Sequence, residues 1–94
     1  MSFKVNEYFD GKVTSLAYSN SEGKATIGVM APGEYEFGTN TVEYMTVVSG
    51  KLKVLLPGKT EWKVYSMSET FIVDKDSKFK LIVEEDSAYK CIYK

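Results

Sequence analysis

Apolar side chains recur at every second position in short runs, and this alternation constrains the fold more than any other feature of the chain. Residues 78–83 and 89–93 show it most clearly. A period of two places successive side chains on opposite faces of a β-strand. No window shows the sustained apolar stripe of an amphipathic helix. We therefore expect an all-β protein.

Turn residues separate these runs and set the expected strands. The strands are predicted at residues 13–19, 25–30, 35–37, 42–48, 51–56, 62–65, 69–73, 78–83 and 89–93. Pro32-Gly33 suits a type II turn, and Ser49-Gly50 suits a tight hairpin. Residues 6–11 fit either a strand or a single helical turn. Eight or nine short strands joined by turns are typical of an antiparallel sandwich or barrel.

Chain length and charge limit the classes of function. A chain of 94 residues has room for a single domain, 1–94. A domain this small has limited stability, so association with a partner subunit would stabilise it. The net charge is −1, and the 12 cationic residues, all lysines, are scattered rather than gathered on a basic face. We therefore expect no nucleic-acid partner.

The sequence also bears on location. Residues 1–7 have no apolar signal core, and no apolar run approaches the ~18 residues of a membrane span. We expect a cytoplasmic protein without a membrane partner.

The chain has few residues suited to binding a metal or to acting as a catalytic nucleophile. The chain has no histidine, and Cys91 is its single cysteine. Carboxylates at positions 34, 36, 43, 74 and 76 are the remaining ligands for a hard ion such as Mg²⁺, but residues 34 and 36 alternate with Tyr35 as a solvated face would. We expect no metal. Without a histidine base, Cys91 is expected to be a small buried hydrophobe rather than a nucleophile, and serine-hydrolase chemistry is excluded.

Glu43 is the sharpest candidate for chemistry. It shares a strand face with Met45 and Val47, which are expected to point into the interior. A carboxylate among apolar side chains is costly unless it is paired or functional. The alternative is that Glu43 lies in water at the mouth of a barrel.

Aromatic residues give a second candidate feature. They are expected in the core or in a dimer interface, and a subset is a candidate for stacking on a flat ligand such as a nucleobase. The residues concerned are Tyr35, Phe37, Trp62, Tyr89 and Tyr93.

One stretch of the chain resembles the first sequence motif of the cupins, which are small β-barrels. It begins at Pro32-Gly33 and continues with Glu43, six further residues and Gly50. A weaker second stretch spans residues 68–77, where Ser68, Asp74 and Asp76 replace the glycine, proline and histidine usual in cupins. The resemblance implies a cupin-like antiparallel β-barrel of the jelly-roll type.

Further segments make the resemblance more specific. In order along the chain they are Asn6-Glu7-Tyr8-Phe9, Gly11-Lys12-Val13, Ile27-Gly28-Val29-Met30, Pro32-Gly33-Glu34-Tyr35, Glu43-Tyr44-Met45-Thr46-Val47, Ser49-Gly50, Val54-Leu55-Leu56-Pro57, Trp62-Lys63-Val64-Tyr65, Phe71, Phe79 and Tyr89-Lys90-Cys91-Ile92-Tyr93. Together they resemble the small bacterial pyrimidine/purine nucleoside phosphorylases of cupin fold, over nearly the whole chain.

That resemblance implies an enzyme, a pentosyltransferase, that splits many purine and pyrimidine nucleosides with inorganic phosphate. The products are the free base and α-D-ribose 1-phosphate, and the reaction is reversible. It also implies a homodimer that needs no metal or other cofactor, with phosphate as co-substrate.

Site residues follow as hypotheses from the chemistry of phosphorolysis, which passes through an oxocarbenium-like sugar. Glu43 is expected to hold the ribose hydroxyls and offset the positive charge. Thr41 and Thr46 are candidates for hydroxyl contacts, and Lys12 or Lys24, with backbone amides, for phosphate. Stacking on the base is assigned to Tyr35, Phe37, Trp62 or Tyr89.

Three alternatives stay open. The first is a metal-free cupin that binds a small sugar or nucleoside without converting it, since one fold hosts many functions. The second is a sugar isomerase with a carboxylate-bound metal. The third is a structural or partner-binding module.

Overall fold

The computed structural model describes residues 3–94, which form ten β-strands. They are β1 (Lys4–Tyr8), β2 (Val13–Asn20), β3 (Gly23–Met30), β4 (Gly33–Gly38), β5 (Glu43–Ser49), β6 (Lys51–Leu55), β7 (Lys63–Ser66), β8 (Thr70–Val73), β9 (Lys78–Val83) and β10 (Ser87–Tyr93). The all-β prediction is confirmed, because no described residue is helical.

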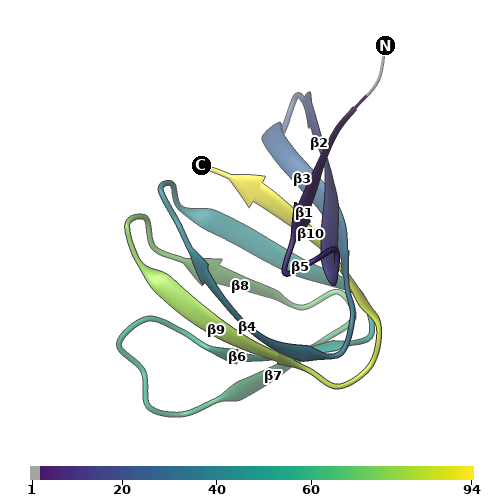
Figure 1. Ribbon diagram of the computed structural model, residues 1–94. Coiled ribbons are helices and arrows are strands. Elements are labelled where there is room, and N and C mark those ends of the chain that lie inside the picture. The colour runs from purple at the N-terminus through teal and green to yellow at the C-terminus, as the bar shows by residue number, and fades with distance from the viewer. Residues whose placement is uncertain (1–2) are drawn as a thin grey trace.

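The strands form two antiparallel sheets. The large sheet has six strands in the order β1-β2-β3-β10-β5-β8, and the small sheet has four in the order β4-β9-β6-β7. The sheets face each other, and the β2–β3 hairpin projects beyond the small sheet (Figure 1). A closed barrel is not confirmed, because hydrogen bonding divides the strands between two sheets instead of joining them in one.

Aromatic side chains span one of the gaps between the sheets. The Phe9 ring, next to β1 of the large sheet, lies 5.0 Å from the Tyr35 ring and 5.5 Å from the Phe37 ring, both on β4 of the small sheet. The Tyr8 ring makes an edge contact with Phe37 at 5.9 Å. Side-chain packing thus connects the β1 and β4 edges where backbone hydrogen bonds do not.

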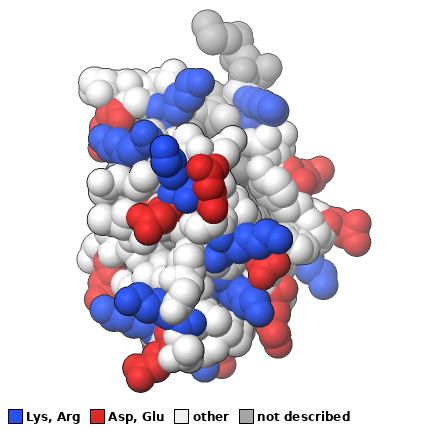
Figure 2. Space-filling model, turned by 90° about the vertical axis from the view of Figure 1, so that its left-hand side faces the viewer, with Lys and Arg blue, Asp and Glu red and all other residues white. Residues whose placement is uncertain are grey.

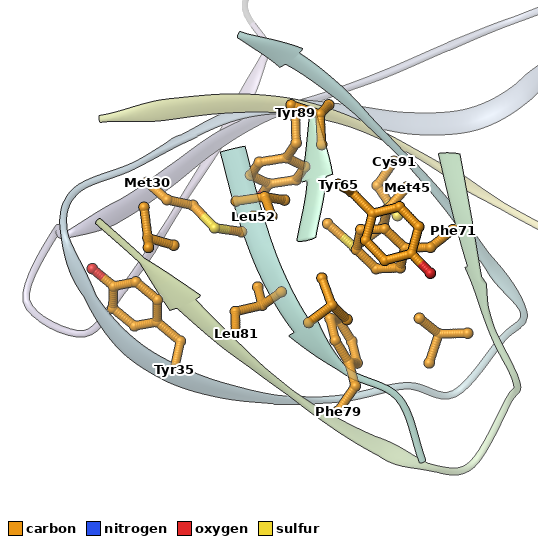
Figure 3. Packing of buried hydrophobic residues seen from close by; sticks show 14 of the residues in the cluster. Met30, Tyr35, Met45, Leu52, Tyr65, Phe71, Phe79, Leu81, Tyr89 and Cys91 are labelled. Carbon is orange, nitrogen blue, oxygen red and sulfur yellow. The ribbon is translucent and has the colours of Figure 1, made fainter. Parts of the chain in front are cut away.

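The core fills the space between the inner faces of the two sheets. From the small sheet, Leu52, Val54 and Leu81 are at most 1% exposed, and from the large sheet Val47 is fully buried. Figure 3 shows Tyr89, Cys91 and Met45 on one side of this core and Phe79 and Leu81 on the other. The alternation along β9 and β10 therefore identified the buried faces of those two strands correctly.

The structure decides one local prediction that was left open and corrects two others. Residues 4–8 form a strand, followed by a turn, which decides between the two alternatives for residues 6–11. Gly33 has φ 159°, which belongs to the start of β4. This differs from the about +80° of a type II turn, so that turn is not formed. Trp62 lies just outside β7.

The predicted hairpin at Ser49-Gly50 is not formed, because β5 and β6 lie in different sheets and do not pair. The chain nevertheless turns sharply there between the two sheets, and glycine is required at position 50. Gly50 has φ 81°, in the left-handed region that glycine adopts without strain. A Cβ at this position would also collide with the Ser87 hydroxyl. That hydroxyl donates to the Lys51 carbonyl oxygen at 3.1 Å and accepts from the Lys51 amide at 3.1 Å, so β10 fixes the start of β6.

Residues 3–94 include no helix with the length and apolar character needed to cross a bilayer.

Candidate functional site

A cavity of ≈ 470 Å³ lies between the two sheets. This volume falls in the range of small-molecule sites, about 300–1,000 Å³. Its walls come from the β1–β2 loop, from β4 and β9 of the small sheet, and from β1, β2, β3, β5 and β10 of the large sheet. The lining residues are Tyr8, Phe9, Ser15, Met30, Glu36, Phe37, Gly38, Glu43, Met45, Phe79, Tyr89, Cys91 and Tyr93.

Glu43 places a carboxylate in this cavity. It begins β5, where it pairs with Tyr93 of β10 on one side and Val73 of β8 on the other. The Cys91 thiol donates a hydrogen bond to Glu43 Oε1 at 3.6 Å. Burial raises the pKa of the Glu43 carboxyl above its ordinary 4.5, and the bond from Cys91 partly opposes that shift. Glu43 therefore holds a proton more readily than a carboxyl in water.

The neighbours of Glu43 on β10 are weak acids that keep their protons. Burial raises the pKa of Tyr89 to about 12. Burial likewise raises the pKa values of the Cys91 thiol and the Tyr93 phenol, with the Glu43 charge acting in the same direction on both. The cavity thus brings the Glu43 carboxylate together with three neutral groups of β10 that can donate hydrogen bonds.

A glycine on the adjacent strand makes room for Tyr89. Gly28 pairs with Tyr89 across β3 and β10, and a Cβ at Gly28 would lie 2.6 Å from atoms of the Tyr89 ring. Real Cβ contacts are not this close, so only glycine lets the ring lie over β3. Tyr93 is held through its hydroxyl, which is 3.1 Å from Thr26 Oγ1.

Aromatic rings make up another part of the cavity wall. Tyr8 and Phe9, each 45% exposed, both contact the half-buried ring of Phe37. Phe37 also packs against Phe79, a core residue, with the two ring centroids 6.0 Å apart. The cavity therefore has two parts. The polar group consists of Glu43 on β5 and of Tyr89, Cys91 and Tyr93 on β10, and the aromatic group consists of Tyr8 at the end of β1, Phe9 in the β1–β2 loop and Phe37 on β4.

The structure brings some of the predicted site residues together. Glu43, Phe37 and Tyr89 all line the cavity. Tyr35 does not. It is buried, with its hydroxyl donating to the Ala31 carbonyl oxygen at 2.5 Å.

Three other predicted residues lie outside the lining. Thr46 points to the outer face of the large sheet, where its hydroxyl is 2.7 Å from that of Thr70. Trp62 borders a different hollow, beside β6 and β7. Thr41 is in the β4–β5 loop, and its hydroxyl is buried without a hydrogen-bond partner. Alternation along β5 already places Thr46 on the face opposite Glu43, so its assignment to the site was inconsistent with that pattern. Trp62 and Thr41 lie outside the strands, where alternation gives no direction.

The predicted phosphate residues are also outside the cavity lining. Lys12 is exposed at the end of the β1–β2 loop, and Lys24 is exposed at the start of β3. No lysine is among the described residues that line the cavity. Lysines and acidic residues alternate over the face shown in Figure 2, without a large patch of one sign.

The carboxylates do not gather as metal ligands would. Within residues 3–94, no three His, Cys, Asp or Glu side chains come together as a metal site.

Several lining residues were missed by sequence reasoning. Tyr8 and Phe9 fell in the segment whose structure was left undecided, and Ser15 gave no signal beyond strand alternation. Cys91 was predicted to be a buried hydrophobe, and it is 1% exposed. Its role as a donor to Glu43 depends on the pairing of β5 with β10, which nothing local specifies.

Comparisons with known proteins agree with this architecture. The family model described as pyrimidine/purine nucleoside phosphorylase matches residues 3–93. A pyrimidine/purine nucleoside phosphorylase of Pseudomonas syringae pv. tomato is 58% identical over 92 residues, covering 98% of this chain and 99% of that protein. One from Alcanivorax borkumensis is 55% identical over 91 residues, covering 97% of each.

Solved structures are similar in fold. A protein of unknown function from Vibrio parahaemolyticus is 46% identical, with a TM-score of 0.93 and full coverage of both chains. An RmlC-like cupin from Shewanella frigidimarina is 15% identical, with a TM-score of 0.74, covering 95% of this chain and 80% of that one. The second likeness concerns the cupin fold alone. By the family match and the identity of these relatives over nearly their whole length, the chain belongs to the pyrimidine/purine nucleoside phosphorylase family.

Proposed function

We propose that this protein cleaves purine and pyrimidine nucleosides with inorganic phosphate, giving the free base and α-D-ribose 1-phosphate. This is the activity of a pentosyltransferase, within the glycosyltransferases, and it is reversible. Family membership supports it, and so do relatives named as nucleoside phosphorylases.

One structural observation carries the proposal. A single cavity holds Glu43, which is half-buried, beside the proton donors of β10 and near a group of aromatic rings. A nucleoside has the matching parts, since its sugar carries hydroxyls and its base is flat and apolar on both faces. The sugar fits the polar group of β5 and β10, and the base fits the aromatic group that includes Phe37.

The reaction makes defined demands on these residues. The bond between C1′ of the sugar and the base nitrogen breaks, and its electron pair leaves with the base. A phosphate oxygen bonds to C1′, and the proton that monohydrogen phosphate gives up balances the one the base takes. Positive charge develops on the sugar between these events. Ionised Glu43 stabilises that charge and accepts hydrogen bonds from the ribose hydroxyls, while Tyr89 and Tyr93 remain donors.

Phosphate is held without arginine, since the chain has none. Lys12 is our first candidate, because it ends the loop that carries Phe9, whose ring lines the cavity. Backbone amides are the other available donors, and Lys24 is the second candidate side chain. Thr41, two residues from Glu43, has a buried hydroxyl without a hydrogen-bond partner and remains our candidate for a hydroxyl contact.

We propose that catalysis needs no metal or other cofactor. Activity after exhaustive dialysis against a chelator should equal that of untreated protein. Loss of activity that added Mg²⁺ restores would instead favour a carboxylate-bound metal. We also propose that residues 1–94 act as one domain in the cytoplasm.

A homodimer is the proposed assembly, formed through the outer face of the large sheet. Val5, Leu16 and Ile27 lie in register across β1, β2 and β3 and are 56%, 43% and 41% exposed. Val29, on the same face, is 53% exposed. Apolar rows of this kind mark interaction surfaces. Light scattering should give twice the mass of one chain, and Ile27→Lys should reduce the measured mass to that of a single chain.

The decisive experiment combines purified protein with uridine and phosphate and measures free uracil. Phosphate-dependent release supports the proposal. Release without phosphate would indicate a hydrolase, and binding of uridine without release would favour the non-catalytic alternative. Adenosine and inosine in parallel test the breadth of the substrate range.

A further inference from the structure

The β1–β2 loop has a backbone that one of its residues, Phe9, is poorly suited to adopt. Phe9, Asp10 and Gly11 have φ values of 53°, 57° and 84°. The Gly11 amide donates to the Tyr8 carbonyl oxygen at 3.1 Å, and the Lys12 amide donates to that of Phe9 at 3.2 Å. The loop is thus a short left-handed turn. Residues with a Cβ are strained there, and only glycine and, less often, asparagine or aspartate adopt it routinely.

Chain reversal does not require phenylalanine in this turn. Asparagine and glycine form left-handed hairpin turns with far less strain. The same chain uses glycine at left-handed positions elsewhere, as at Gly50. Phe9 therefore occupies a position where its own backbone preference is unfavourable.

Core burial does not account for Phe9 either. Its side chain remains 45% exposed, whereas Phe79 and Phe71 in the core are 2% and 3% exposed. Its ring packs against Tyr35 at an interplanar angle of 50° and against Phe37 at 88°. These are tilted and edge contacts, and they leave part of the ring uncovered at the wall of the cavity that contains Glu43.

We infer that Phe9 is the ring that stacks on the base of the bound nucleoside, and that the strained turn serves to place it there. Strained residues cluster at functional sites, where the surrounding structure enforces them. Stacking accepts any base, because every base has a π face, and would therefore suit a broad substrate range. This inference rests on the proposed function, since that function supplies a ligand with a flat base.

The test uses three variants that separate the ring from the turn. Phe9→Leu keeps an apolar side chain in the same strained turn but removes the flat ring. Phe9→Tyr keeps the ring. Asp10→Gly relaxes the turn at an exposed neighbour and leaves Phe9 unchanged.

We expect Phe9→Leu to lower kcat/KM for uridine and inosine roughly 5- to 150-fold, the range that follows from the strength of base stacking. Phe9→Tyr should restore activity to near the unmodified level. Asp10→Gly should raise Tm by roughly 2–6 °C, because strain is relieved, and should leave activity unchanged.

A substrate without a flat base adds a readout that a merely structural role would not move. In 5,6-dihydrouridine the base ring is puckered and stacks poorly. The preference for uridine over dihydrouridine, as a ratio of kcat/KM values, should shrink in Phe9→Leu and persist in Phe9→Tyr. An unchanged preference in Phe9→Leu would overturn the inference.

Binding measurements keep the two proposals distinguishable. If the unmodified protein releases no base, the proposed reaction fails, and titration calorimetry with uridine then tests Phe9. Weaker uridine binding by Phe9→Leu would still support stacking. Equal binding by both proteins, or no binding by either, would overturn it.

Discussion

The space between the two sheets is filled at one end and hollow at the other, and the two ends depend on different residues. At the filled end, Leu52, Val54 and Leu81 are at most 1% exposed. They belong to one cluster of buried apolar residues, in which Val54 and Leu81 are paired across β6 and β9. At the hollow end, Glu43 and Tyr89 border a cavity of ≈ 470 Å³. Dense apolar packing stabilises a small domain, whereas a cavity with a carboxylate forgoes that stabilisation. We therefore predict that stability depends mainly on the filled end, and we place the proposed binding site at the hollow end.

The strongest challenge to this division is Leu81→Ala. Removing a fully buried leucine side chain should lower the free energy of unfolding by about 2–5 kcal/mol. That corresponds to a fall in Tm of roughly 10–30 °C for a domain of this size. Below the new Tm, uracil release should be preserved. Thermal unfolding followed by circular dichroism measures the change, and a fall below about 4 °C would show that the filled end is not the source of stability.

Glu43→Gln should have the opposite profile. Loss of the charge that stabilises the sugar should reduce kcat/KM for uridine by about 10²–10³-fold, which corresponds to roughly 2.7–4 kcal/mol of barrier. Tm should fall little, because a partly buried carboxylate is replaced by a neutral group of the same shape. Near-normal turnover by folded Glu43→Gln would remove Glu43 from the mechanism.

Gly28→Ala sharpens the comparison at the boundary between the two ends. The added Cβ would lie 2.6 Å from the Tyr89 ring, so the ring must move. Such overpacking should cost about 1–3 kcal/mol of stability and should also lower activity by displacing Tyr89 from the cavity. The matched control is Gly38→Ala, where the added Cβ meets nothing closer than 3.9 Å. Equal loss of stability in both variants would count against a special role of Gly28.

The smallest expected effect is a dependence of stability on pH. The pKa of Glu43 is raised in the folded protein, so the folded state binds this proton more tightly than the unfolded state. The contribution of Glu43 to folding stability is therefore most favourable below pH 4.5, the ordinary pKa of its carboxyl. That contribution is lost as the pH rises through the raised pKa of the folded state. Glu43→Gln should remove this dependence of stability on pH. As pH rises from about 4 to about 7, the difference in Tm between the variant and the unmodified protein should therefore shift in favour of the variant.

Denaturation curves at several pH values measure the difference between the two proteins. Glu34→Gln removes the same charge from an exposed position on β4 and serves as the control. A gap between Glu43→Gln and the unmodified protein that stays constant with pH would show that the Glu43 carboxyl is not perturbed by burial.

The strand content followed from local sequence. Alternation in residues 78–83 and 89–93 identified both the strands and their buried faces, because side chains alternate between the two faces of any strand. A turn at Gly50 was likewise predicted locally, and Gly50 has the positive φ that glycine tolerates. The predicted pairing of the strands on either side was wrong, because β5 and β6 enter different sheets. The same local reasoning placed Glu43 on the inner face with Met45 and Val47, which are 3% and 0% exposed.

Local sequence left the β1–β2 loop undecided, and Phe9 adopts there a conformation against its own preference. Packing of the Phe9 ring on Tyr35 and Phe37 accompanies that conformation, and these contacts join residues about one quarter of the chain apart. No propensity rule anticipates a turn whose residues are unfavourable on their own.

By itself, the sequence determined an all-β chain of short strands and an inward-facing Glu43, since both depend on the period-two geometry of a strand. Only the tertiary structure decided that Cys91 donates to Glu43 and that Gly28 accommodates Tyr89. Those contacts depend on which strands pair and in which register. Pairing between distant strands is set by how the two inner faces pack together, which no single stretch of sequence encodes.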